Sequence, residues 1–298
     1  KRAGPARAVA DTMVPVGATD LRLKETAGLR VGGLVVVSRP ATPEWIHALG
    51  MDVAPGRQQF TWKPAAMTVN WERTITAVDG ERVTLDAPLT TALEAAFGGG
   101  ELFALDEADR VTEVGIESLR CESAHDAANP HDEDHAWEAI RIGAVRDSWV
   151  AGVTAVFFAG SAVNVGPGAR RVTVQDCVSL APVSELGGYR RHTFHTAGQQ
   201  TLFLRCRAED GRNDFTAGHL AGDADIRNNI RKRLVDDNQA VGGKAQKILR
   251  LIKPAVWIVR VDDDGDLGVP CVGEASGAHR VAGFLPAPLM LAVGRGDD

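Results

Sequence analysis

Short runs in which apolar and polar residues alternate recur through the middle of the chain. Two of them, 172–175 (VTVQ) and 202–205 (LFLR), are each followed within three residues by a cysteine. Upstream, 114–117 (VGIE) ahead of Cys121 match the same pattern, and 148–151 (SWVA) match it more weakly. Alternation with a period of two is typical of strands rather than helices. The chain therefore contains a repeated unit built from strands.

The repeated unit indicates a solenoid. With Ile116, Val150, Val174 and Leu204 taken as equivalent, successive copies lie roughly 24 to 34 residues apart, which is typical of a β-solenoid coil with loops of variable length. A unit this short cannot bury its own apolar face, so it has to stack on its neighbours. We predict that these four residues point inward and that their strands stack in parallel. The predicted strands are 114–116, 148–150, 172–174 and 202–204.

The third copy carries a resemblance to a known family. Its pattern x-V-x-V-x-D-C ends at Cys177 and follows a corner formed by Asn164-Val165 and Gly166-Pro167-Gly168. Over about residues 110–220 the chain resembles the pectate-lyase-like superfamily. The resemblance implies an all-β, right-handed parallel β-helix and a secreted or cell-surface protein. It does not assign a reaction, because that superfamily includes polysaccharide lyases, glycoside hydrolases, epimerases and phage tailspikes.

The sequence outside the repeats suggests three parts. We expect an N-terminal β-rich module with one short helix over 1–106, the coils over 107–222, and over 223–298 a cap on the open end of the solenoid or an unrelated or truncated tail. Residues 1–13 are polar and predict little order unless they cap the solenoid. After Gly222 the strand pattern stops, and 226–253 favours pieces of amphipathic helix. Because the chain begins at Lys1 without Met, we expect a fragment or a mature form.

A short helix is predicted over 42–51. Thr42 suits its N-cap, Pro43 suits the first helical position, and Gly50 suits its exit. We expect Trp45, Ile46 and Leu49 to share the face that packs on neighbouring strands.

Strands surround this helix. Residues 14–40 predict two or three strands separated by glycines, and 73–89 predict a hairpin around Asp79-Gly80, a strong turn signal. Trp62 and Trp71 lie in a segment rich in Pro and Gly, and we interpret that segment as a loop. They are either an exposed platform for sugars or anchors in the core.

The composition limits the kinds of binding partner that the sequence predicts. A formal charge of −6 argues against nucleic-acid binding, because phosphate neutralisation needs a basic surface. A local cluster of cations still allows an acidic polysaccharide to bind. The chain is 44% hydrophobic, which fits a substantial core, and no run is long enough to cross a bilayer. We expect a polysaccharide partner, no nucleic acid and no membrane insertion, with the oligomeric state open.

Cysteines and acidic runs predict no resident cofactor. The four cysteines show neither C-x-x-C nor zinc-site spacing, and we interpret Cys121, Cys177 and Cys206 as buried free thiols that follow equivalent strands, with disulfides left open. The acidic run 132–134 offers oxygen ligands for Ca²⁺, with a solvated loop as the alternative. The run 262–266 lacks the alternating ligands of an EF-hand loop and predicts a turn.

Two long excursions, 122–137 and 181–195, leave the coils after equivalent strands. They should therefore emerge at the same corner, and because strands stack about 4.8 Å apart the loops should lie about 10 Å from each other. We expect loops outside the stacked core to make few buried contacts. The catalytic candidates are Tyr189, Arg190, Arg191, His192, His195 and Asp214; the substrate-binding candidates are His125, Asp126, Asp132, Asp134, His135, Trp137, Arg212 and Asn213.

These residue types fit more than one chemistry. In β-elimination a cation such as Arg190 or Arg191 neutralises a uronate carboxylate, and a base such as His192, His195 or Tyr189 removes the neighbouring proton. A glycoside hydrolase would need two carboxylates at a fixed separation, for which Asp214 and the acidic residues of the two loops are the pool. We expect a polysaccharide lyase, with a hydrolase or a non-catalytic adhesin or tailspike-like solenoid as alternatives.

Overall fold

The computed structural model describes residues 2–52, 61–64, 67–106, 110–218, 224–227 and 230–232. The acidic run 262–266, Cys271 and most of the segment 226–253 lie outside the described residues. Their regular secondary structure is almost entirely β-strand, apart from one short α-helix and short 3-10 turns. None of the described helices has the length and apolar character needed to span a membrane.

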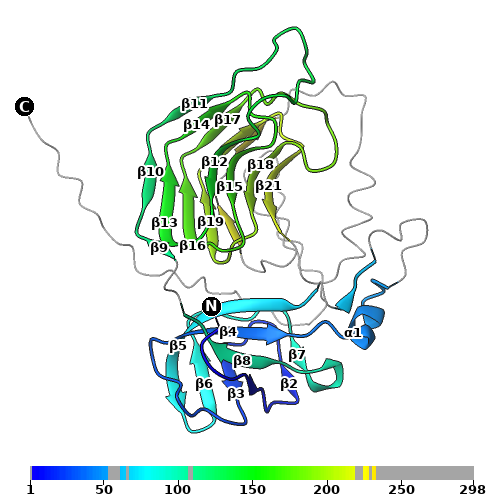
Figure 1. Cartoon of the computed structure of the whole chain (residues 1–298), viewed down its shortest axis with the longest axis vertical. Helices are drawn as coiled ribbons and strands as arrows, with labels where there is room; N and C mark the ends of the chain where they lie inside the picture. Colours follow the sequence, from blue (N-terminus) through cyan, green and yellow to red (C-terminus); the bar gives the residue numbers. More distant parts are fainter. Residues whose placement is uncertain are drawn as a thin grey trace, which may run out of the picture. The chain divides into compact units, whose positions relative to one another are not determined.

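The described residues between 111 and 232 form a parallel β-helix. The coils stack in three parallel sheets, and the strands of successive coils lie side by side (Figure 1). Sheet I contains β9 (Val111–Thr112), β10 (Gly115–Glu117), β13 (Val145–Ala151), β16 (Arg170–Gln175), β19 (Thr201–Leu204) and β22 (Ala224–Arg227). Sheet II contains β11 (Arg120–Glu122), β14 (Thr154–Val156), β17 (Val178–Leu180), β20 (Arg207–Glu209) and β23 (Ile230–Lys232). Sheet III contains β12 (Glu138–Ile142), β15 (Ser161–Val165), β18 (His192–Thr196) and β21 (Asn213–Ala217).

The predicted parallel register is confirmed for three of the four marker residues. Ile116 pairs with Val150, and Val150 pairs with Val174. The choice of Leu204 is wrong by one residue, because Val174 pairs with Phe203, whose side chain is fully buried. Leu202, Phe203 and Leu204 are three successive apolar residues, so the sequence there gives no period-two signal to choose between them. This error of one residue matters because shifting the register of a strand by one residue places every side chain on the other face.

The corner between sheets I and II has the same shape in each of the first four coils. Its first residue has a positive φ in every case: Ser118 at 54°, Gly152 at 62°, Asp176 at 54° and Arg205 at 50°. A single left-handed residue turns the chain sharply enough to start the next strand after two residues. The repetition of this corner explains why the strands of successive coils remain in register.

Cysteines follow this corner in two coils only. Cys177 and Cys206 occupy equivalent positions, are buried and are free thiols, as expected. A hydrogen bond with the Cys177 thiol and, after it, burial raise the pKa of Cys206. Cys121 is also a free thiol but is not equivalent, because it lies inside β11, where it pairs with Ala155 of β14. The prediction that all three cysteines follow equivalent strands is therefore wrong for Cys121.

The parallel pairing continues past residue 222, contrary to our expectation. Ala224–Arg227 pairs with β19, and Ile230–Lys232 pairs with β20. The prediction of helix from residue 226 is therefore wrong for these two short segments. The basic amphipathic pattern here fits a helix, but it also contains short runs that can form a strand. The preceding coil offers such a run backbone groups to pair with, so it adds a strand to the existing sheet.

The N-terminal part forms an antiparallel sheet in the order β1-β8-β4-β5-β6-β3. Its strands are β1 (Arg7–Ala8), β8 (Glu101–Ala104), β4 (Leu34–Arg39), β5 (Val69–Asp79), β6 (Arg82–Leu85) and β3 (Asp20–Arg22), with a separate pair β2 (Met13–Val14) and β7 (Leu93–Glu94). The expectation of little order over 1–13 is wrong, because β1 pairs with β8 and Met13 pairs with Glu94.

The helix and the hairpin are confirmed. In α1 (Pro43–Ala48) the side chain of Thr42 accepts a hydrogen bond of 3.2 Å from the backbone N–H of Trp45. β5 and β6 pair antiparallel through a turn at Gly80, whose φ is 55°. A bulge between Ile75 and Ala77 leaves Ala77 exposed, so the alternation breaks there.

Trp62 and Trp71, for which the sequence allowed either a sugar platform or a core anchor, belong to the core of the N-terminal part. Trp71 lies in β5, not in a loop, is fully buried, and donates from Nε1 to Oγ1 of Thr90 over 2.8 Å. Trp62 packs against Trp45 with ring centroids 5.8 Å apart. Neither ring is an exposed platform for sugars.

Buried polar contacts connect the N-terminal sheet to the β-helix. The guanidinium of Arg170 is fully buried and donates from Nη2 to Asp86 over 2.6 Å and to Thr74 over 3.2 Å. The side chain of Gln199 accepts from the backbone N–H of Glu72 over 2.8 Å and donates to the carbonyl of Asn70 over 3.0 Å.

Candidate functional site

The two long loops lie at one corner of the β-helix, as predicted. The first follows β11 in coil 1 and the second follows β17 in coil 3, so both connect sheet II to sheet III. Between them, coil 2 makes the same connection with only four residues, 157–160. The short middle connection allows the outer two loops to meet.

Charged and polar contacts join the loops directly. The guanidinium of Arg190 forms a two-point ion pair with the carboxylate of Glu133, in which Nη2 lies 2.8 Å from Oε2. This pairing lowers the pKa of Glu133 and raises that of Arg190. His135 donates from Nε2 to the carbonyl of Val183 over 3.0 Å. The two loops therefore form one unit rather than the opposite walls of an open groove.

Several substrate-binding candidates in the first loop make contacts that hold the loop in its conformation. The carboxylate of Asp132 is buried and accepts the backbone N–H groups of Asp126 and Asp134 over 2.8 and 3.0 Å, and these bonds lower its pKa. Nδ1 of His135 is 2.8 Å from the hydroxyl of Ser123. The ring of His125 packs on Phe157, whose centroid is 4.6 Å away. Asp126 and Asp134 remain exposed.

Arg191 has a supporting position at the base of the second loop. Its guanidinium donates to Oγ and to the carbonyl of Ser184 over 3.1 and 2.6 Å. Burial lowers its pKa. Its backbone carbonyl accepts the N–H groups of Arg212 and Asn213. The expectation that this loop makes few buried contacts is therefore wrong at Arg191. The guanidinium of Arg191 is already hydrogen-bonded to acceptors of the protein.

The outer face of sheet III carries a row of polar side chains, one from each coil. Arg141 pairs with Asn164, Asn164 pairs with His195, and His195 pairs with Thr216. All four side chains are at least partly exposed, whereas the flanking row of Ile140, Val163 and Phe194 is buried. Alternation along each strand separates these two rows. We call the exposed row the sheet III ladder.

Two histidines lie together beside this ladder. The ring centroids of His192 and His195 are 5.9 Å apart. Nε2 of His192 donates to the side-chain oxygen of Asn213 over 2.9 Å, and Nδ1 of His195 is 2.8 Å from Oγ1 of Thr216. Burial lowers the pKa of both rings, with proximity to His195 and Arg212 lowering that of His192 further. Both rings are therefore neutral at neutral pH and can accept a proton.

Glu138 brings a carboxylate to the same face. It accepts from Nδ2 of Asn164 over 2.5 Å and lies 3.4 Å from Nη1 of Arg141, whose side chain is 77% exposed. Its charge partly offsets the effect of burial on the pKa of His195. Glu138, Arg141, Asn164 and Thr216 were not among the predicted site residues.

Asp214 is buried and not exposed on this face. Its residue is 5% exposed, and its Oδ1 lies under Gly211, where a Cβ would approach to 2.0 Å. Asn213, its neighbour in β21, faces the histidines instead. Its burial beneath Gly211 therefore separates Asp214 from the exposed catalytic candidates and removes it from the pool of hydrolase carboxylates on this face.

The remaining candidates lie at the edge of the site. Arg212 donates from Nη1 to the carbonyl of Gly188 over 2.6 Å and so closes the second loop. Tyr189 stacks on Trp137, with ring centroids 5.4 Å apart and an interplanar angle of 26°. Among the described residues, no group of three or more His, Cys, Asp or Glu side chains could hold a metal ion. Asp132 and Glu133 are directed at protein partners, so the structure gives no support for a Ca²⁺ site in the run 132–134.

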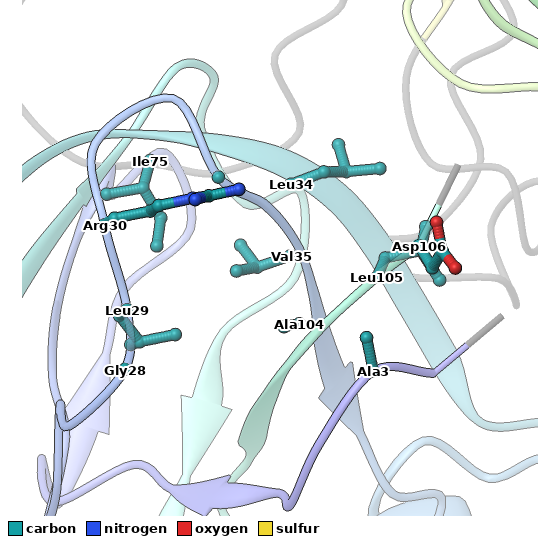
Figure 2. A pocket seen from close by; sticks show the side chains of 11 residues that line it. Ala3, Gly28, Leu29, Arg30, Leu34, Val35, Ile75, Ala104, Leu105 and Asp106 are labelled. Carbon is teal, nitrogen blue, oxygen red and sulfur yellow. The ribbon is translucent and has the colours of Figure 1, made fainter. Parts of the chain in front are cut away.

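A separate hollow of about 300 Å³ lies in the N-terminal part (Figure 2). Its walls are mostly apolar, with Val35, Ile75 and Ala104 among them, and Arg30 and Asp106 bring the charged side chains. None of the predicted site residues lines it.

Comparison with known proteins gives a fold likeness only. No family model matches the sequence, and no curated protein matches it. Three solved phage tailspikes match 76% of the chain: gp49 of Pseudomonas phage LKA1 (TM-score 0.38, 13% identity), gp54 of Acinetobacter baumannii bacteriophage AP22 in complex with A. baumannii capsular saccharide (0.35, 8%), and gp61 of Pseudomonas phage phi297 (0.30, 11%). The match spans 41%, 44% and 56% of those chains, respectively. The assignment of a parallel β-helix rests on the strand pairing of this chain itself.

Proposed function

We propose that the chain is a polysaccharide-active β-helix protein that cleaves a uronate-containing polysaccharide by β-elimination on the outer face of sheet III. The observation that carries this proposal is the pair of neutral histidines on the same outer sheet face as an exposed arginine. β-Elimination needs a base that is unprotonated at working pH and a cation near the uronate carboxylate. Uronate polysaccharides occur at and outside cell surfaces, so a secreted or cell-surface location fits the proposal.

His195 is the proposed base. Its Nδ1 is engaged by Thr216, which orients the ring and leaves Nε2 to accept the proton next to the uronate carboxylate. The lowered pKa keeps the ring unprotonated at neutral pH. His192 has its Nε2 engaged by Asn213, so we assign it a positioning role. A base built on a strand is held more firmly than one on a loop.

Arg141 is the proposed cation, in place of Arg190 and Arg191. The latter two are each held by two contacts, to Glu133 and to Ser184, whereas Arg141 makes one contact of 3.4 Å with Glu138 and its side chain is 77% exposed. Arg141 lies in the same ladder as His195, with Asn164 between them, so the two strands are about 10 Å apart. A long, exposed arginine side chain can cover much of that distance, and a bound uronate would occupy the rest.

A non-catalytic carbohydrate-binding protein is the second candidate. The observation that favours it is the commitment of Arg190 and Arg191 to protein contacts, which removes two of the cations expected near a uronate. A glycoside hydrolase is less well supported, because Asp214 is buried and Glu138 would need a second carboxylate.

Incubation with a panel of uronate polysaccharides separates these functions. Formation of an unsaturated product, followed by its ultraviolet absorbance, supports β-elimination. An increase in reducing ends without absorbance indicates a hydrolase, and binding without either product indicates a non-catalytic protein. Either of the last two results would overturn the proposed reaction.

A further inference from the structure

The loop unit presents an aromatic pair beside the sheet III ladder. Tyr189, the single tyrosine of the chain, comes from the second loop and Trp137 from the end of the first. Their rings stack, and Tyr189 nevertheless remains 67% exposed. Glu138, at the start of β12, follows Trp137 directly, so the pair lies at the entrance of the sheet III strands.

Trp137 is held in place from below. The backbone N–H groups of Gly160 and Ser161 both donate to the carbonyl of Trp137 over 2.9 Å. A Cβ at residue 160 would approach this carbonyl to 2.9 Å and the ring atom Cε3 to 3.3 Å. The glycine therefore allows the indole to sit tightly on the coil 2 corner, so the ring does not have to be ordered when a ligand arrives.

The charge next to Tyr189 is already balanced. The guanidinium of Arg190 lies 5.3 Å from the centre of the tyrosine ring and is paired with the carboxylate of Glu133. The two rings therefore lie beside a neutral ion pair rather than an unpaired cation. Such a surface favours the C–H face of an uncharged sugar, whereas a uronate would face both Glu133 and the ring without an unpaired cation.

We propose that Tyr189 and Trp137 form a binding platform for an uncharged pyranose residue of the polysaccharide. This inference rests on the proposed function and defines its substrate more narrowly. The substrate is a heteropolysaccharide in which a neutral sugar on the platform precedes or follows the uronate at His195. Tyr189 is therefore a binding residue and not the base.

The test compares three variants of the full chain by calorimetric titration with uncharged hexasaccharides of glucose, mannose and galactose. At least one should bind the parent. Tyr189→Ala should weaken that binding by at least about tenfold, since it removes the exposed aromatic ring. Tyr189→Phe keeps the ring, and Leu186→Ala removes another exposed apolar side chain of the same loop. Both should bind within about twofold of the parent.

The platform is refuted if Tyr189→Ala binds as the parent does, if Tyr189→Phe loses as much as Tyr189→Ala, or if no uncharged hexasaccharide binds. Each of these results can be distinguished from failure of the proposed reaction. The reaction is tested by a different measurement, the formation of unsaturated product from uronate polymers. Binding that depends on Tyr189 without any product would support the platform and contradict β-elimination. Product formation that is unchanged in Tyr189→Ala would support β-elimination and contradict the platform.

Discussion

Val174→Asp tests the inward register of the β-helix. Val174 is fully buried and pairs with Val150 and Phe203 in the neighbouring coils. The substitution loses about 1.5–3 kcal/mol of apolar burial. It also buries a carboxyl group without a partner, which costs several kcal/mol more. The sum is a large part of the stability of a typical domain, about 5–15 kcal/mol.

The cost should depend on pH, and its sign follows from burial. Desolvation raises the pKa of the new Asp in the folded state above its unfolded value of about 3.9. The penalty from the charge is therefore small below that value and grows as pH rises toward the folded pKa. Denaturant unfolding of the parent and the variant at pH 4 and pH 8 measures this difference.

Gln175→Asp is the matched control, because the next residue of the same strand points outward and is partly exposed. It should lower the unfolding free energy by no more than about 0.5 kcal/mol. If Val174→Asp unfolded at the same denaturant concentration as the parent, or if its deficit were the same at both pH values, the inward assignment of Val174 would be wrong.

Three further predictions follow from buried contacts and pKa shifts. Asp86→Ala should cost about 3–5 kcal/mol in denaturant unfolding, because it strips the carboxylate from the buried Arg170, whereas Glu122→Ala at the exposed pair with Arg120 should cost about 0–1 kcal/mol; equal costs would contradict the buried contact. Arg191→Ala should lower stability by about 1–3 kcal/mol by leaving both polar groups of Ser184 without this partner, and an unchanged unfolding curve would show that Arg191 does not support the loop. The acidic limb of activity should have its midpoint below about pH 6.5, because burial lowers the pKa of His195 and protonation removes the base; a midpoint above that value would contradict a buried neutral base.

The sequence predicted the parts of the fold whose signal is local. Alternation around Val150 and Val174 identified the stacked strands, and the positions of the two long loops identified their common corner. The same method failed at Leu204, where three apolar residues in succession hide the period. It also failed after Gly222, where edge strands form because the coil below offers pairing partners, a tertiary effect that a local pattern does not contain.

The candidate site was predicted less completely for a related reason. The repeat was recognised from sheet I alone, so the strands of sheet III were not aligned with one another. Without that alignment Arg141, Asn164 and His195 are far apart in the sequence and show no common feature. Asp214 was grouped with Asn213 because they are neighbours in the chain, although Asp214 is buried and Asn213 is partly exposed beside His192. Glu133, which pairs with Arg190, lies in a different coil, so the sequence around Arg190 gives no sign of this ion pair.

The most direct test of the proposed function is the initial rate of unsaturated product formation on a uronate polysaccharide by the parent, His195→Ala and His131→Ala. His131 is an exposed loop histidine outside the sheet III ladder and serves as the control. We predict that His195→Ala lowers the rate by at least about a hundredfold, the scale for loss of a general base, while His131→Ala retains the parental rate. Equal rates for the parent and His195→Ala, or no product from any uronate polymer, would contradict the assignment of the outer face of sheet III as a lyase site.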